Sequence, residues 1–126
     1  MSGGRLVLVA DDEEDILTLV TTVLQNAGHQ VVPVRDGAEA LAAVRDRKPD
    51  LAVIDISMPE VDGLEVLRRL RADAETSELP VVLLSAQAQE ADVARGFETG
   101  ASAYVKKPFS PRELAQRVND LLGSSD

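Results

Sequence analysis

Five short apolar runs alternate with five stretches of helical periodicity along this chain. A strand that is followed by a helix, repeated in this way, predicts a parallel sheet with helices on both faces. The strands are expected near residues 5–10, 30–34, 50–55, 80–85 and 102–105. The helices are expected near residues 13–27, 36–46, 62–73, 89–99 and 111–122. The fold class is therefore expected to be α/β, with a layer of helices on each face of one sheet.

The ends of the expected helices carry capping residues. Asp36, Asp62 and Ser110 each stand three residues before a glutamate, which is the spacing of a capping box or of its aspartate analogue. Gly28 and Gly100 follow the first and fourth helices, where a residue in the left-handed conformation commonly ends a helix. These signals support the helix assignments.

The length of the chain fits one domain. A chain of 126 residues can bury one ordinary core but is too short for two domains, so we expect a single domain over 1–126. Its core is expected over about 5–122, with 123–126 as a tail or the start of a linker. No apolar stretch approaches the roughly 20 residues that cross a membrane, and the N-terminus lacks the regions of a signal peptide. We expect a cytoplasmic protein that does not contact membranes.

Charge and missing residue types exclude several functions. The formal net charge of -9 argues against direct nucleic-acid binding, because that affinity depends on basic residues that neutralise phosphates. The local cluster of Arg68, Arg69 and Arg71 is interpreted as a solvated helix face. The chain has no cysteine and a single histidine, His29, so thiolate and two-histidine metal sites are excluded. Oxygen ligands remain, and these favour Mg²⁺, Ca²⁺ or Mn²⁺.

Acidic residues and one lysine stand at the ends of three expected strands. Asp11 and Asp12 follow the first strand, Asp55 ends the third, and Lys107 follows the fifth. Ligands of an open parallel sheet bind outside the carboxyl ends of its strands, so these side chains are expected to converge. One acid is enough to cap the first helix, whereas several adjacent carboxylates repel one another unless a cation is present. The pattern therefore predicts a divalent-metal site next to a phosphoryl group.

Asp55 is the expected phosphoryl acceptor, because aspartate carboxylates form acyl-phosphate intermediates. A role as a turn or capping residue is the alternative. The loop over 56–63 contains a proline and a glycine, and we expect it to leave the Asp55 carboxylate exposed at the sheet edge. Lys107 is preferred over Lys106 for this site, because neighbouring residues of a strand point to opposite faces.

Two further residues carry weaker signals. Ser85 ends the fourth strand beside the small Ala86, so its hydroxyl could donate to a phosphoryl oxygen; a role as a cap is the alternative. Tyr104 lies on the fifth strand, where ordinary packing is the alternative to a functional role. His29 lies in a turn and is assigned no role.

The ordered set of motifs resembles the receiver domain of two-component response regulators. It comprises the acid pair, Asp55 with the loop to Gly63, Ser85-Ala86 and Lys107-Pro108-Phe109, and the resemblance covers the chain from Arg5 to Leu122. The resemblance implies a flavodoxin-like, doubly wound (βα)5 fold with a five-stranded parallel sheet of order 2-1-3-4-5. It also implies that Asp55 accepts a phosphoryl group from a sensor histidine kinase or a phosphotransfer protein.

The resemblance also implies roles for the metal ligands. Asp12 would bind Mg²⁺ directly, with Mn²⁺ as an alternative ion, and Asp11 would act largely through water. Asp55 would supply a carboxylate oxygen and Ser57 its backbone carbonyl. Ser57 and Gln87 also occupy positions that tune the lifetime of the acyl phosphate in the family, and their side chains do not indicate that lifetime.

The remaining roles concern the switch. Lys107 would pair with the phosphoryl oxygens, while Ser85 and Tyr104 would move together and bias a pre-existing equilibrium. The surface of the fourth helix, fifth strand and fifth helix would then contact a downstream protein or a fused output domain. Lys106 lies where the family often has an apolar residue, which would alter that recognition surface. The chain is expected to be a switch that catalyses only its own phosphorylation and dephosphorylation.

Other functions fit less well. A phosphatase of the haloacid dehalogenase type needs a second aspartate two residues after Asp55, where this chain has Ser57. A flavodoxin needs a phosphate cradle after the first strand, where the acidic run would repel phosphate. The serious alternative is an interaction module of the same fold that does not respond to phosphate. The sequence does not name the kinase or the target, and it leaves open homodimer formation and whether the receiver stands alone.

Overall fold

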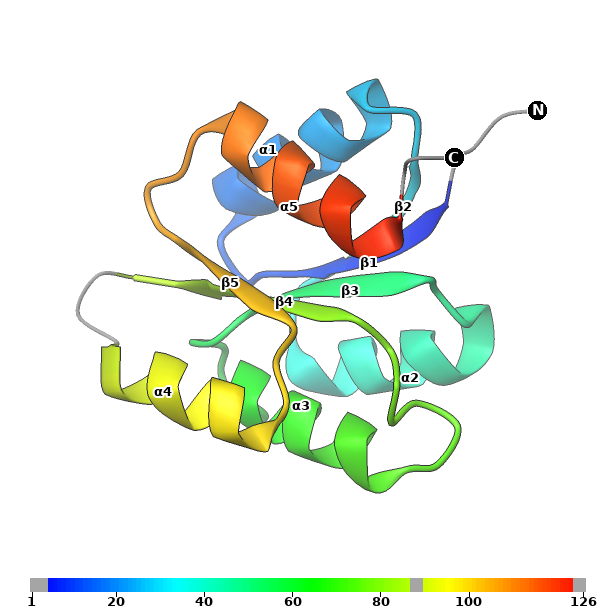
Figure 1. The fold of residues 1–126 in the computed structure, drawn as a ribbon, viewed down its shortest axis with the longest axis vertical. Helices are drawn as coiled ribbons and strands as arrows, with labels where there is room; N and C mark the ends of the chain where they lie inside the picture. The colour runs from blue at the N-terminus through cyan, green and yellow to red at the C-terminus, as the bar shows by residue number, and fades with distance from the viewer. Residues whose placement is uncertain (1–4, 87–89, 124–126) are drawn as a thin grey trace.

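The computed structural model describes residues 5–86 and 90–123. Strands and helices alternate throughout these residues (Figure 1). The strands are β1 (Leu6–Ala10), β2 (Gln30–Val34), β3 (Leu51–Asp55), β4 (Val81–Ser85) and β5 (Ala103–Lys106). The helices are α1 (Glu14–Asn26), α2 (Gly37–Arg47), α3 (Gly63–Ala72), α4 (Glu90–Thr99) and α5 (Pro111–Leu122). Every predicted element is therefore confirmed, with small shifts at the ends.

The strands form one parallel sheet of order β2-β1-β3-β4-β5. This is the predicted flavodoxin-like winding. Pro33 lies in β2, which is an edge strand, in keeping with the inability of proline to donate to a central ladder. The carboxyl ends of all five strands point to the same edge of the sheet. Asp55 pairs there with Leu84, and Ser85 pairs with Lys106.

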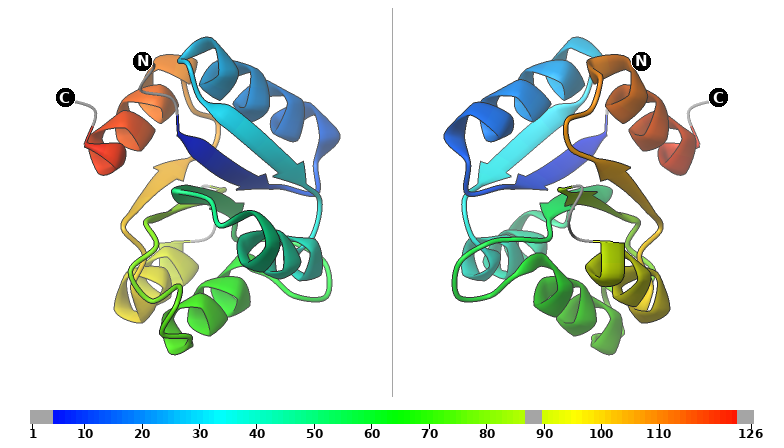
Figure 2. Two further views of the ribbon diagram at one scale, coloured as in Figure 1. Left: turned by 90° about the vertical axis from the view of Figure 1, so that its right-hand side faces the viewer. Right: turned by 90° about the vertical axis from the view of Figure 1, so that its left-hand side faces the viewer.

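Two apolar cores lie on the two faces of the sheet. Helices α1 and α5 cover one face and α2, α3 and α4 cover the other (Figure 1, Figure 2). Alternate residues of each strand enter the two cores: Val7 and Val9 pack toward α1 and α5, whereas Leu8 and Ala10 pack toward α2 and α3. Strands β3 and β4 are buried along their whole length, as expected of central parallel strands. No helix in the described ranges is long and apolar enough to cross a bilayer.

The predicted capping residues are confirmed. The side chains of Asp36, Asp62 and Ser110 each accept a hydrogen bond from the backbone N–H three residues later. The two helix-ending glycines, Gly28 and Gly100, have φ values of 97° and 121°, in the range that favours glycine. These local sequence signals therefore mark where α2, α3 and α5 begin and where α1 and α4 end.

The predicted solvated arginine face is only partly correct. Arg68 and Arg69 are exposed and form ion pairs with Glu65. Arg71 is half-buried instead, and its Nε donates a 3.0 Å hydrogen bond to the carbonyl oxygen of Gly100. Its Nη1 donates to the carbonyl oxygen of Thr76 at 3.3 Å. Arg71 thus joins α3 to the turn before β5, a tertiary contact that helical periodicity cannot reveal.

Candidate functional site

Three aspartates meet at the carboxyl edge of the sheet. Asp11 and Asp12 follow β1, and Asp55 is the last residue of β3. One carboxylate oxygen from each lies within 4.8 Å of the other two. Asp11 and Asp55 are buried, whereas Asp12 is exposed. The predicted convergence of the three carboxylates is confirmed.

Lys107 is the cation of this cluster. Its Nζ lies 3.1 Å from Asp11 Oδ2, 3.4 Å from Asp55 Oδ1 and 3.1 Å from Glu13 Oε1. The backbone N–H of Lys107 donates to the carbonyl oxygen of Ser85, which holds the lysine beside the end of β4, and its peptide bond to Pro108 is cis. Lys106 is exposed. Of these two lysines, Lys107 is therefore the one whose ammonium lies at the acidic cluster.

The expectation that the Asp55 carboxylate is exposed is wrong. Asp55 is only 3% exposed, and Ile56 and Met58 of the following loop are also buried. The loop folds back over the strand end, and the backbone N–H of Ser57 donates to Asp55 Oδ1 at 3.4 Å. The ammonium of Lys107 also contacts this carboxylate, at 3.4 Å from Oδ1. A proline and a glycine in the loop indicated a turn but not the direction in which the turn folds.

Burial shifts the pKa values of the site. Burial, followed by repulsion from Asp11, raises the pKa of Asp55 to about 6, although Lys107 and the Ser57 N–H act in the opposite direction. Burial likewise raises the pKa of Asp11. For Lys107, burial alone would lower the pKa, but the carboxylates of Asp55, Asp11 and Glu13 together hold it above its ordinary value. The site therefore holds more negative charge than its lysine neutralises.

Two glycines fix the loop that follows Asp55. Gly63, the first residue of α3, lies directly against the backbone of Asp55 and Ile56, so a Cβ at Gly63 would overlap the Asp55 carbonyl oxygen. The Gly63 N–H donates to the Ile56 carbonyl oxygen at 2.9 Å. A Cβ at Gly37 would overlap the backbone of Val61 in the same loop. Close backbone approach, rather than an unusual φ, explains the need for glycine at both positions.

Gly63→Ala is expected to lower the free energy of unfolding by about 1–2 kcal/mol. Overpacking costs about 1–3 kcal/mol, and the better helix propensity of alanine offsets up to about 1 kcal/mol of it. Urea unfolding followed by circular dichroism measures the change. Gly28→Ala, where a Cβ would meet nothing within 4 Å, separates packing from conformational strain, because its cost comes only from its positive φ. A Gly63→Ala chain of undiminished stability would contradict the close approach.

The structure places the other predicted site residues at or near this edge. Ser85 is buried at the end of β4, and its Oγ donates a 3.0 Å hydrogen bond to the carbonyl oxygen of Ala86. Tyr104 is half-buried, with its ring edge-on to Phe97 of α4 at a centroid distance of 5.6 Å. Ser57 is exposed. Gln87 lies outside the described residues.

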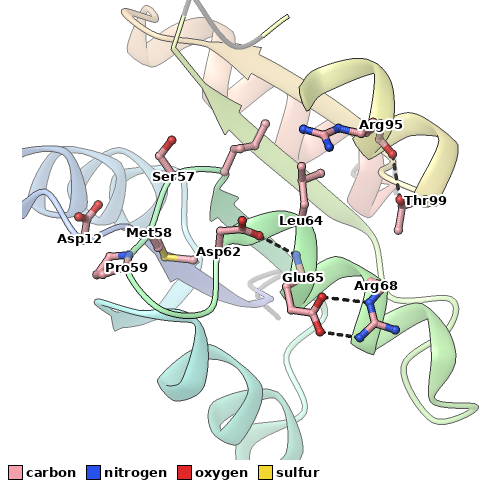
Figure 3. Close-up of a pocket in the computed structure, with 11 residues that line it drawn as sticks. Asp12, Ser57, Met58, Pro59, Asp62, Leu64, Glu65, Arg68, Arg95 and Thr99 are labelled. Atoms are coloured by element: carbon pink, nitrogen blue, oxygen red, sulfur yellow. Dashed lines mark hydrogen bonds and ion pairs between the residues drawn. The ribbon is translucent and has the colours of Figure 1, made fainter. Parts of the chain in front are cut away.

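A cavity of about 760 Å³ opens beside the acidic cluster. Asp12, Ser57 and Met58 line one side of it, while Arg95 and Thr99 of α4 lie on the other side (Figure 3). Ile56 and Leu64 also line it. Asp12 is the one member of the acidic cluster that lines this cavity.

Glu13 is the third acid of the run that follows the first strand, and the sequence assigned it no role of its own at the site. Its carboxylate contacts Lys107, a pairing that the sequence did not predict. Glu13 stands at the N-cap position of α1 and makes no capping hydrogen bond with its side chain. Its place directly after the acid pair was the only available signal.

The acidic cluster fits a hard divalent cation. Oδ2 of Asp11 is buried and has no hydrogen bond within the described part of the chain, and its 3.1 Å contact with Lys107 Nζ is an ion pair. Mg²⁺ commonly binds proteins through one or two carboxylates and completes its shell with water or phosphate oxygens. Two buried carboxylates beside an exposed one offer that ligand set.

This parallel (βα)5 fold carries an acid pair, a separate buried aspartate and a lysine at one edge of its sheet. That combination is typical of domains that receive a phosphoryl group on a carboxylate. The family of response regulator receiver domains matches residues 7–119 of this chain. The chain belongs to this family, and its Asp11, Asp12 and Asp55 form the acidic site typical of the family's phosphoacceptor pocket.

Individual relatives agree with the assignment. The alkaline phosphatase synthesis transcriptional regulatory protein PhoP of Bacillus subtilis is 42% identical over 98% of this chain and 50% of its own length. The crystal structure of the receiver domain of NtrX from Brucella abortus has a TM-score of 0.88 and 34% identity, and the match covers 94% of this chain and 99% of that one. The chain spans about half the length of the curated relatives it matches.

One similar structure contains a metal. The receiver domain of the sensor histidine kinase PA1611 from Pseudomonas aeruginosa PAO1 has a magnesium ion coordinated in its active site cleft. It has a TM-score of 0.88 and 26% identity to this chain, and the match covers 96% of this chain and 99% of that one.

Proposed function

We propose that this receiver domain is a phosphorylation-dependent switch in which Asp55 accepts a phosphoryl group from a sensor histidine kinase or a phosphotransfer protein. The observation that carries the proposal is the buried Asp55 carboxylate, held at a strand end beside an acid pair and within 3.4 Å of the Lys107 ammonium. A carboxylate with a raised pKa of about 6 is still mostly ionised at pH 7, so it can act as a nucleophile.

The transfer needs few groups from the protein. An oxygen of Asp55 forms a bond to phosphorus as the bond from phosphorus to the donor's histidine nitrogen breaks. The electron pair of that bond stays on the nitrogen, which takes up a proton from solvent. Lys107 donates to the phosphoryl oxygens and offsets their charge. Hydrolysis later returns the carboxylate and releases inorganic phosphate, so the domain catalyses only changes to its own phosphorylation.

Asp11, Asp12 and Asp55 would hold Mg²⁺, with Mn²⁺ as an alternative and the Ser57 backbone carbonyl as a further ligand. The bound ion would reduce the repulsion between the carboxylates and the incoming phosphoryl oxygens. The buried Asp11 oxygen without a hydrogen bond and the magnesium in the PA1611 receiver domain support this assignment. We assign Asp12 to direct binding and Asp11 largely to binding through water.

The output is proposed to involve Ser85, Tyr104 and the surface of α4, β5 and α5. Ser85 would move toward the phosphoryl group and Tyr104 would rotate with it, which would change the surface offered to a downstream protein or a fused output domain. The contact of Tyr104 with Phe97 of α4 supports a link between β5 and α4. Relatives of about twice this length are named as transcriptional or DNA-binding regulators, which favours a transcriptional output.

The test is the intact mass of the protein after incubation with acetyl phosphate. We expect a gain of one phosphoryl group with Mg²⁺, no gain with a chelator, and a modified peptide that contains Asp55. Incubation with autophosphorylated histidine kinases is the second arm, because some receivers use small donors poorly. Failure with both kinds of donor would refute the proposal and favour the interaction module that does not respond to phosphate.

Mg²⁺ is expected to raise the free energy of unfolding of the unphosphorylated chain by about 1.4 kcal/mol at ten times its Kd. The reason is that native but not unfolded chains bring the three carboxylates together. Thermal unfolding over a Mg²⁺ titration measures the effect. Asp12→Asn is expected to remove most of it, while the control Asp46→Asn, an exposed aspartate on α2, keeps it. An equal response of both variants would place the binding elsewhere.

A further inference from the structure

The ammonium group of Lys107 lies among three carboxylates in the unphosphorylated structure. Nζ of Lys107 has three carboxylate neighbours, of which Glu13 accepts a hydrogen bond and the other two form ion pairs with it. These are Asp11 Oδ2 at 3.1 Å, Glu13 Oε1 at 3.1 Å and Asp55 Oδ1 at 3.4 Å. A phosphoryl oxygen at Asp55 would therefore compete with these carboxylates, and first with the hydrogen bond to Glu13, for the Lys107 ammonium.

The three neighbours differ in how easily they release the lysine. Asp11 and Asp55 have side chains that are 0% and 4% exposed, so they are fixed within the site. The side chain of Glu13 is 62% exposed, and it is one methylene longer than an aspartate. Water can replace Lys107 around an exposed carboxylate at little cost, but not around a buried one. Glu13 is therefore the partner that Lys107 gives up.

We propose that Glu13 is a positioning residue that competes with the phosphoryl group for the ammonium of Lys107 and so slows phosphorylation of Asp55. This inference rests on the proposed function. The contact is present before transfer and is lost when Lys107 turns to the phosphoryl oxygens. Its removal therefore affects the rate of phosphorylation but not the rate of hydrolysis, because the phosphorylated state no longer contains it.

The chain offers a matched control for Glu13. Glu14 is the next residue, its side chain is also 62% exposed, and its partner is Arg35 rather than Lys107. Glu14→Gln therefore makes the same charge change at the same helix end without touching the lysine. Glu13→Asp separates contact from charge, because the shorter side chain keeps the charge but draws its carboxylate back from Nζ.

The experiment measures phosphorylation by acetyl phosphate and the later loss of the phosphoryl group for all four chains with Mg²⁺. Exposed ion pairs change equilibria by about five-fold at most, so Glu13→Gln and Glu13→Asp are expected to phosphorylate about two- to five-fold faster than the wild type. Glu14→Gln should match the wild type, and all four should lose phosphate at one rate. Equal acceleration by both Gln variants, or a Glu13→Asp chain like the wild type, would overturn the proposal in favour of general electrostatics.

A second measurement does not depend on phosphorylation. Trace acetylation by acetic anhydride, quantified by mass spectrometry without Mg²⁺, compares the reactivity of Lys107 with that of the exposed Lys106 in the same chain. Release from Glu13 is expected to raise the ratio about two- to five-fold in both Glu13 variants and to leave it unchanged in Glu14→Gln. An unchanged ratio in the Glu13 variants would overturn the inference even if Asp55 is phosphorylated. A wild type that accepts no phosphate would instead refute the proposed function.

Discussion

The Asp55→Asn chain is expected to gain no phosphoryl group from acetyl phosphate or from a phosphorylated kinase. An amide cannot form an acyl phosphate, and the other two aspartates are less well placed to replace it. Asp11 directs one oxygen to the Glu13 N–H and the other to Lys107, while Asp12 is exposed outside the buried part of the cluster. Intact mass and peptide mapping after incubation with Mg²⁺ and donor give the result directly.

The control for this variant is a conservative change at an aspartate outside the site. Asp46→Asn alters the same functional group on the exposed surface of α2 and should be labelled like the wild type. Circular dichroism shows whether both variants keep the fold. Labelling of the Asp55→Asn chain at wild-type level on another residue would disprove the assignment of Asp55 as the acceptor.

The fold could be predicted almost completely from local signals. Strands of this chain are continuous apolar runs, and helices such as α3 and α5 begin at side-chain caps that the sequence displays openly. The strand order came from the family resemblance, because alternation alone does not say which strands are neighbours. Once the sheet is parallel, the convergence of Asp11, Asp55 and Lys107 at one edge follows from topology.

The parts that could not be predicted depend on tertiary contacts of single side chains. The burial of Asp55 depends on how the loop to Gly63 folds back, and the backbone contact that forces this path joins residues that no periodic pattern relates. The same holds for Arg71, whose partners are backbone carbonyls in two other segments. Glu13 reaches Lys107 across 94 positions of sequence. Convergence is set by topology, whereas burial and pairing are set by packing.

The carboxylates of the site repel one another in the folded chain. Two buried carboxylates share one lysine, and burial acts against the charged form of each. The surrounding cores on both faces of the sheet supply the stability that this arrangement lacks. Such repulsion favours a bound cation, and it leaves a stability penalty that can be measured.

The Asp55→Asn chain is accordingly expected to be more stable than the wild type at pH 7 without Mg²⁺. Raising the pKa of a carboxyl from 3.8 to about 6 corresponds to about 3 kcal/mol of native-state destabilisation at neutral pH. The amide carries no charge and so avoids this penalty, which already includes the favourable ion pair with Lys107. At about 3–6 °C per kcal/mol for a chain of this size, the variant should unfold several degrees higher.

The pH dependence gives this prediction its sharpest form. Because the native carboxyl has the higher pKa, the native wild type binds more protons than the unfolded chain between about pH 4 and pH 6. Below pH 3.8 the carboxyl is protonated in both states and Asp55 costs no stability. The cost grows as the pH rises, and it is complete once the pH has passed about 6. The advantage of Asp55→Asn should be full at pH 7 and disappear toward pH 4, whereas Asp46→Asn should follow the wild type throughout. Urea unfolding in a chelating buffer at several pH values measures it, and an advantage that stays constant with pH would show that the Asp55 charge is not its cause.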